Sequence, residues 1–173
     1  MQYEVDLWYK ECKFILNLKD NEMLYISCHS NSKEKAITFY NYEKKKEIKA
    51  IHINIDFDNI IVSRISNNII AIYELQKITL IDTNNHEIIK SIENQKNIHC
   101  LYALKDKYLI VAKAKKLEQY EFEEEGKNLK LISEKNDIEI NDNIKNIGCL
   151  KDGKLVLLSS SGEVKILTMD KIQ

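Results

Sequence analysis

Apolar and polar residues alternate in short segments along most of the chain. Clear examples are Lys77–Asp82 and Val164–Thr168, in which single polar residues separate Ile78 from Leu80 and Val164 from Ile166. A period of two, together with many Ile, Tyr, Phe and Thr residues, is typical of a strand with one face buried. Polar stretches such as Thr83–Asn85 separate the segments and suit exposed tight turns. The pattern therefore predicts an all-β chain of short antiparallel strands.

The alternating segments belong to an internal repeat. The triplet Leu-Lys-Asp occurs at 18–20, 104–106 and 150–152, and each copy leads into an apolar run. A degenerate copy, Ile65–Asn68, precedes the equivalent run in between. The copies are separated by about 40 to 46 residues, a period that points to a repeat architecture. The chain thus consists of four units, each of about four short strands.

The ends of the chain suggest how the repeat is completed. The fourth unit stops after its third strand, near Met169, whereas residues 2–8 are strand-like and have no place in the first unit. We expect this N-terminal segment to form the missing outermost strand of the last unit, which would remove an exposed sheet edge. The prediction is a single domain, residues 1–173, with units at 9–51, 55–92, 97–132, and 143–169 plus 2–8.

The repeat length and the end of one unit resemble those of WD40-type β-propeller blades. The segment Ile78–Ile92 is similar to the end of a WD repeat, with Ile81-Asp82 in place of Trp-Asp. None of the four units keeps the tryptophan, and there is no Gly-His opening. The resemblance implies a β-propeller of four blades with four antiparallel strands each. An open arc, a piece of a larger propeller and half of an eight-bladed dimer are the alternatives.

Charge and composition exclude several classes of partner. The 26 basic residues are matched by 27 acidic ones, and the only arginine is Arg64. Nucleic acid is therefore not expected, because phosphate backbones attract strongly basic surfaces. The apolar runs are far shorter than the ~20 residues of a membrane-spanning helix, and the start of the chain is acidic, unlike a secretory signal. We predict an intracellular protein, in the cytoplasm rather than the nucleus.

No motif for catalysis, cofactor binding or metal binding is found. The phosphate-binding loops, the nucleophile elbow and the zinc-binding helix motif are all absent. Cys28-His29 and His99-Cys100 are adjacent pairs, and neighbouring residues on a strand point to opposite faces, which opposes a shared metal. We expect Cys100 and Cys149 to pack in the core, and Ser159–Gly162 to be a turn rather than an anion site.

The resemblance implies a platform that binds other proteins or peptides through loops on one face. We therefore predict a non-enzymatic scaffold, a subunit or adaptor of a larger assembly. One alternative is a half-ring that contributes blades to a composite ring, with homo-oligomers if the ring is incomplete. Another is an enzyme or ligand binder using the central channel, but the inner strands are mostly apolar. The predicted partner-binding residues are His29, Asn31, Phe57, Asp58, Glu74, Lys115 and Ser160.

Overall fold

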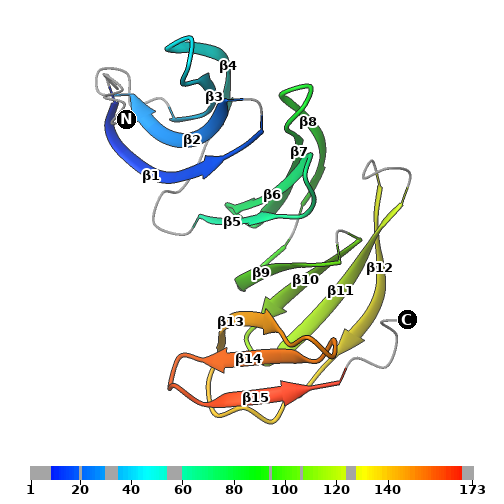
Figure 1. Cartoon of the computed structure of the whole chain (residues 1–173). Helices are drawn as coiled ribbons and strands as arrows, with labels where there is room; N and C mark the ends of the chain where they lie inside the picture. The colour runs from blue at the N-terminus through cyan, green and yellow to red at the C-terminus, as the bar shows by residue number, and fades with distance from the viewer. Residues whose placement is uncertain are drawn as a thin grey trace. The chain divides into compact units, whose positions relative to one another are not determined.

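The described part of the chain folds into short β-strands (Figure 1). The computed structural model describes residues 9–19, 21–29, 35–53, 60–93, 95–105, 107–123 and 128–168. These residues form fifteen strands and contain no helix. The prediction of an all-β chain is confirmed.

The strands form four antiparallel sheets, and strand order within each sheet follows the chain. Sheet 1 contains β1 (Tyr9–Asn17), β2 (Glu22–His29), β3 (Lys35–Asn41) and β4 (Lys46–Ile53). Sheet 2 contains β5 (Ile61–Arg64), β6 (Ile69–Glu74), β7 (Lys77–Asp82) and β8 (Glu87–Ile92). Sheet 3 contains β9 (Ile98–Leu104), β10 (Tyr108–Lys113), β11 (Lys116–Glu123) and β12 (Asn128–Lys135). Sheet 4 contains β13 (Ile144–Cys149), β14 (Leu155–Ser159) and β15 (Val164–Leu167).

Each sheet corresponds to one predicted repeat unit. Three sheets have the four strands that the repeat predicts, and the fourth has three strands within the described part of the chain. The N-terminal segment 2–8, predicted to complete the fourth unit, lies outside the described residues. Its pairing therefore stays a prediction.

The chain divides into two compact units. Unit 1 comprises residues 1–58 and 83–87, and unit 2 comprises 59–82 and 88–173. In unit 1, the turn between β7 and β8 belongs with sheet 1. The ring centroids of His86 and Phe39 are 4.5 Å apart, and Nε2 of His86 is 3.0 Å from Oε2 of Glu22.

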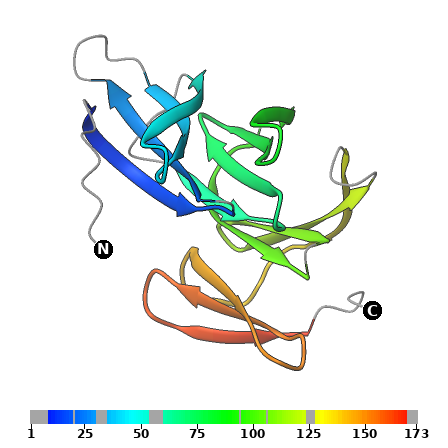
Figure 2. The ribbon, with the colours of Figure 1, turned by 45° about the horizontal axis from the view of Figure 1, so that its top comes forward.

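Unit 2 is a stack of three sheets with sheet 3 in the middle. Leu109 and Val111 of β10 belong to a core shared with sheet 2, whereas Ile110 and Ala112 belong to a core shared with sheet 4. Alternate residues of one strand thus serve two different cores, which is the period-two rule applied to a sheet buried on both faces. Figure 2 shows sheet 4, in orange and red, beside sheet 3, in yellow-green.

The first strands of the three sheets of unit 2 are neighbours. β5 lies against β9, and β9 lies against β13. Cys100, on β9, is buried in the core between sheets 3 and 4, and Cys149, on β13, packs against the same core. Burial raises the pKa of the Cys100 thiol. The expectation that these two cysteines pack in the core is therefore confirmed.

Candidate interaction face

Three hairpin turns of unit 2 are joined to the connections between its sheets by backbone hydrogen bonds. After sheet 2, the Gln95 N–H donates to the Gln76 carbonyl at 2.7 Å. After sheet 3, the Ile138 N–H donates to the Lys115 carbonyl at 2.9 Å. At sheet 4, the Ser160 N–H donates to the Asn143 carbonyl at 2.9 Å. We call the three turns and their connections the loop face; it consists of residues 74–77, 95–97, 113–116, 136–143 and 159–163.

These bonds give the loop face a defined shape. Most loops keep exposed backbone groups that bind water and move freely. Here the turns of sheets 2 and 3 each accept a backbone bond from the connection that follows, and the turn of sheet 4 donates one to the connection that precedes it. A surface ordered in this way loses less conformational entropy when a partner binds.

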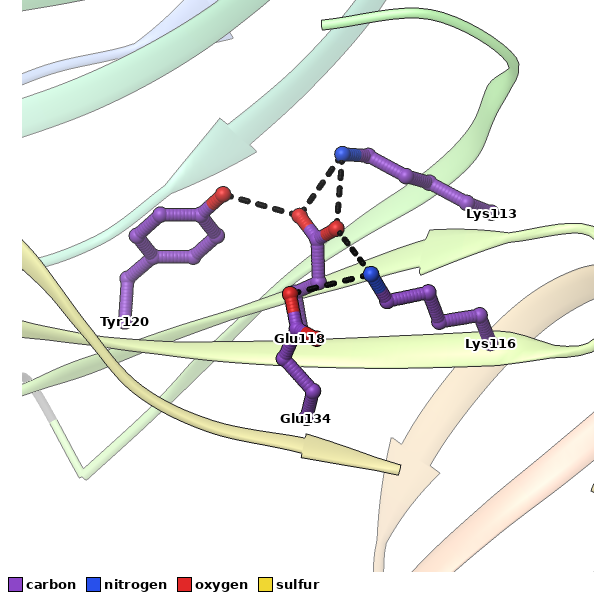
Figure 3. Close-up of polar contacts among 5 residues, drawn as sticks. All are labelled: Lys113, Lys116, Glu118, Tyr120 and Glu134. Atoms are coloured by element: carbon purple, nitrogen blue, oxygen red, sulfur yellow. Dashed lines mark hydrogen bonds and ion pairs between the residues drawn. The ribbon is translucent and has the colours of Figure 1, made fainter. Parts of the chain in front are cut away.

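A buried carboxylate anchors the turn between β10 and β11 (Figure 3). Glu118 is buried, and its oxygens accept hydrogen bonds from Nζ of Lys113, at 2.8 and 2.7 Å, and from the Tyr120 hydroxyl, at 2.8 Å. Nζ of Lys116 lies 3.0 Å from Oε1 of Glu118 and 2.9 Å from Oε1 of Glu134. The lysines on the two sides of the turn thus both bind the Glu118 carboxylate.

The electrostatics of this cluster favour the ionised carboxylate. Burial alone would raise the pKa of Glu118, but the hydrogen bonds from Lys113, Lys116 and Tyr120 outweigh it and lower the pKa. Burial, and after it the hydrogen bond to Glu118, raises the pKa of Tyr120 well above its usual range. Hydrogen bonds to Glu134 and Glu118 raise the pKa of Lys116. Glu118 therefore stays ionised and Lys116 stays cationic near neutral pH.

Sheet 2 has a related arrangement at the equivalent turn. Nζ of Lys77, which occupies the repeat position of Lys116, lies 3.6 Å from Oε1 of Glu74. The Glu74 side chain is only 1% exposed. Glu74 was predicted to contact a partner, but its carboxylate lies beneath the turn and does not reach the surface. Its contribution to the loop face is to hold the turn.

The turn between β14 and β15 is ordered by serine hydroxyls. The Glu163 N–H donates to Oγ of Ser159 at 3.0 Å, and Oγ of Ser159 lies 2.8 Å from Oγ of Ser161. Gly162 has a φ of 88°, a conformation that favours glycine. The prediction that Ser159–Gly162 is a turn between two strands is confirmed.

The predicted partner-binding residues are placed very differently. Lys115 and Ser160 are exposed on the loop face. His29 is the last residue of β2, in unit 1. Asn31, Phe57 and Asp58 lie outside the described residues. The structure thus brings Lys115 and Ser160 to one loop face, together with Glu74 beneath it.

Sequence reasoning missed the Glu118 cluster. Four of its members lie within residues 113–120, but the sequence there reads as an ordinary polar-apolar alternation, and Glu134 comes from the next strand. The register places Glu118 opposite Val111 and Lys116 opposite Lys113, so that both lysines can reach one carboxylate. Charged residues on both sides of a two-residue turn were the available signal.

Other functional features were sought among the described residues. No three His, Cys, Asp or Glu side chains there are grouped closely enough to hold a metal ion. In the same part of the chain, no helix is long and apolar enough to cross a membrane.

Comparison with known proteins identifies the fold. Neither a scan against protein-family models nor a search of curated proteins finds a match. Among solved structures, a chain of the Mitotic Checkpoint Complex has a TM-score of 0.64 and 9% identity, with 92% of this chain and 50% of that chain covered. BamB from Moraxella catarrhalis has a TM-score of 0.63 and 9% identity, with 91% and 44% covered. Hsv2p from Kluyveromyces lactis has a TM-score of 0.60 and 13% identity, with 90% and 47% covered.

The fold is a partial β-propeller. The four sheets are its blades, and the chain spans about half the length of each of these structures. Membership of the WD repeat family stays a prediction, since no family model matches. The Trp-Asp positions carry Tyr40-Asn41, Ile81-Asp82, Tyr120-Glu121 and Leu167-Thr168.

Proposed function

We propose that this partial propeller is a non-enzymatic module that binds other proteins or peptides through its loop face. Propeller neighbours include a component of the Mitotic Checkpoint Complex, which supports a role as a subunit or adaptor. The loop face supports binding rather than catalysis, because its turns are ordered by backbone hydrogen bonds and because the charges of Lys113 and Lys116 are paired with Glu118.

Leu75 carries this proposal. It is the first of the two residues between β6 and β7, and both have positive φ, 41° for Leu75 and 64° for Gln76. Such turns favour Asn, Asp or Gly, and positive φ is uncommon for a bulky side chain. Leu75 is nevertheless 52% exposed. Single exposed apolar residues are common, so exposure alone assigns no role to Leu75; its position at the tip of a two-residue turn with positive φ, on the loop face, makes it the contact to test.

Polar residues on the turns of sheets 3 and 4 add to the chemistry of the face. Lys115 supplies a positive charge at the tip of the neighbouring turn, and Ser160 supplies a hydroxyl at the third turn. An apolar anchor accompanied by polar groups is the usual composition of a protein-binding hot spot. We propose that the partner offers an apolar side chain for Leu75 and an acidic or carbonyl group for Lys115.

The test substitutes Leu75→Asn. Asparagine suits positive φ, so this variant should fold at least as stably as the parent while losing the apolar anchor. Affinity capture from the cell of origin, quantified by mass spectrometry, should recover a set of partners with the parent chain and lose it with L75N.

The matched control is Leu131→Asn, which removes another exposed leucine, on β12 and away from the loop face. It should retain the partners. Equal capture by the parent chain and L75N would refute the role of Leu75, and failure of the parent chain to capture any protein would refute the proposed function.

A further inference from the structure

Within the described residues of unit 2, sheet 4 presents one uncovered apolar face. Val164 and Ile166 of β15 are 62% and 56% exposed, and Leu158 of β14 is exposed as well. In the strand register, Val164 lies opposite Leu158 and Ile166 lies opposite Val156, so all four side chains share one face. The opposite face of the same strands is packed in the core with sheet 3. Single exposed apolar residues are common, but a contiguous group on one sheet face indicates a docking surface.

The internal repeat identifies what this face lacks. In the strand registers, Ile78 of sheet 2, Leu117 of sheet 3 and Val164 of sheet 4 hold the same position, next to the turn between the second and third strands. Ile78 is buried against sheet 3, and Leu117 is buried against sheet 4. Each is covered by the sheet that follows it in the chain. Val164 has the same place in its blade but is exposed, because unit 2 has no further sheet after sheet 4 among the described residues.

The neighbouring positions show the same relation. Leu158 occupies the place of Tyr73 in sheet 2 and of Ala112 in sheet 3. Tyr73 and Ala112 are both buried in the cores between sheets. The exposed face of sheet 4 is therefore built like a blade-to-blade contact. Its occupant should be another propeller blade.

We infer that a second copy of this chain supplies that blade, so that two half-propellers form one ring. The chain spans 50%, 44% and 47% of the propeller structures described above, so two copies provide about the length of a complete one. A net charge of −1 per chain does not oppose self-association. Closed assemblies of identical chains with two-fold symmetry are the commonest soluble oligomers. This inference does not depend on the proposed function of the loop face.

The test is the solution mass of the purified 173-residue chain. Sedimentation velocity and light scattering between about 1 and about 100 µM should give twice 20.3 kDa, because specific interfaces of ordinary size are populated in this range. The double variant Val164→Lys with Ile166→Lys should raise the dimer dissociation constant at least ~100-fold, since it would bury two unpaired charges in the contact.

The control is Leu131→Lys, which places a charge on an exposed leucine of sheet 3 that is not on the uncovered face. It should leave the dimer unchanged. Both lysine variants should also keep the circular dichroism spectrum and melting behaviour of a folded β protein, because all three positions are exposed within one chain. A chain that is monomeric over the whole range overturns the inference. A dimer whose dissociation constant is unchanged by V164K/I166K also overturns it.

Discussion

Replacing Glu118 by glutamine tests whether this carboxylate holds the turn between β10 and β11. Glutamine keeps the shape and one acceptor oxygen, but it leaves Lys113 and Lys116 without the buried anion that both contact. Removing one member of a fully buried ion pair costs about 3–5 kcal/mol. Both lysines are partly exposed and can turn towards water, so we expect a smaller loss, about 2 kcal/mol of the free energy of unfolding.

The free energy of unfolding lost in E118Q should depend on pH in a defined direction. The folded pKa of Glu118 is lowered, so its ionised form contributes stability above the usual carboxylate pKa, and this contribution disappears as pH falls through the folded pKa. Urea unfolding of the parent chain and E118Q should therefore differ most near neutral pH. The difference should shrink as pH falls below the usual carboxylate pKa and through the lower folded pKa of Glu118.

A matched variant distinguishes burial from charge alone. Glu134→Gln removes a carboxylate that contacts the same Lys116 but is exposed to solvent. Exposed ion pairs contribute at most about 1 kcal/mol, so E134Q should have a small effect. A loss for E118Q no larger than that for E134Q, or one that does not change with pH, would refute the proposed anchoring by Glu118.

Two further results are expected. Ile110→Ala leaves a cavity at a fully buried site between sheets 3 and 4 and should lower the free energy of unfolding by about 3 kcal/mol in urea titration. Leu131→Ala, at an exposed site, should change it by less than about 1 kcal/mol. Similar losses for the two variants would contradict the stacking of these sheets. Burial and the bond to Glu118 raise the pKa of Tyr120, so this phenol should ionise above the usual range of tyrosine in an ultraviolet titration. Because the folded form holds this proton more tightly, its stabilisation is present below about pH 10 and is lost as pH rises further; Tyr120→Phe should abolish that alkaline loss, and an unchanged alkaline transition would show that Tyr120 does not cause it.

Local pattern predicted the strands well because it reports a local property. The alternation in Lys77–Asp82 marks the bounds of β7, and that in Glu87–Ile92 those of β8. The recurrence of such segments also predicted that the chain folds as four sheets, three of them with four strands in the described residues. The polar residues between strands, such as Ser159–Gly162, predicted turns because small and hydroxylated residues satisfy the backbone there.

The candidate site could be predicted only in part. Lys115 and Ser160 were expected on a loop face because turns between strands are exposed, and they are exposed. Glu74 was expected there for the same reason, but it is the last residue of β6 and lies under the turn next to Lys77. Burial of a charged side chain depends on a cation from another strand, and the register that brings the two together is not written in either segment alone.

Period-two alternation was sufficient to determine which residues share a face of each strand, and the repeat was sufficient to determine how many sheets the chain makes. Whether a given face is covered was decided only by tertiary structure. Leu117 and Val164 hold the same place in strands with a similar alternating pattern, yet Leu117 is buried and Val164 is exposed. The difference arises because burial requires a neighbouring sheet, and a strand's own residues specify its apolar side but not what packs against it.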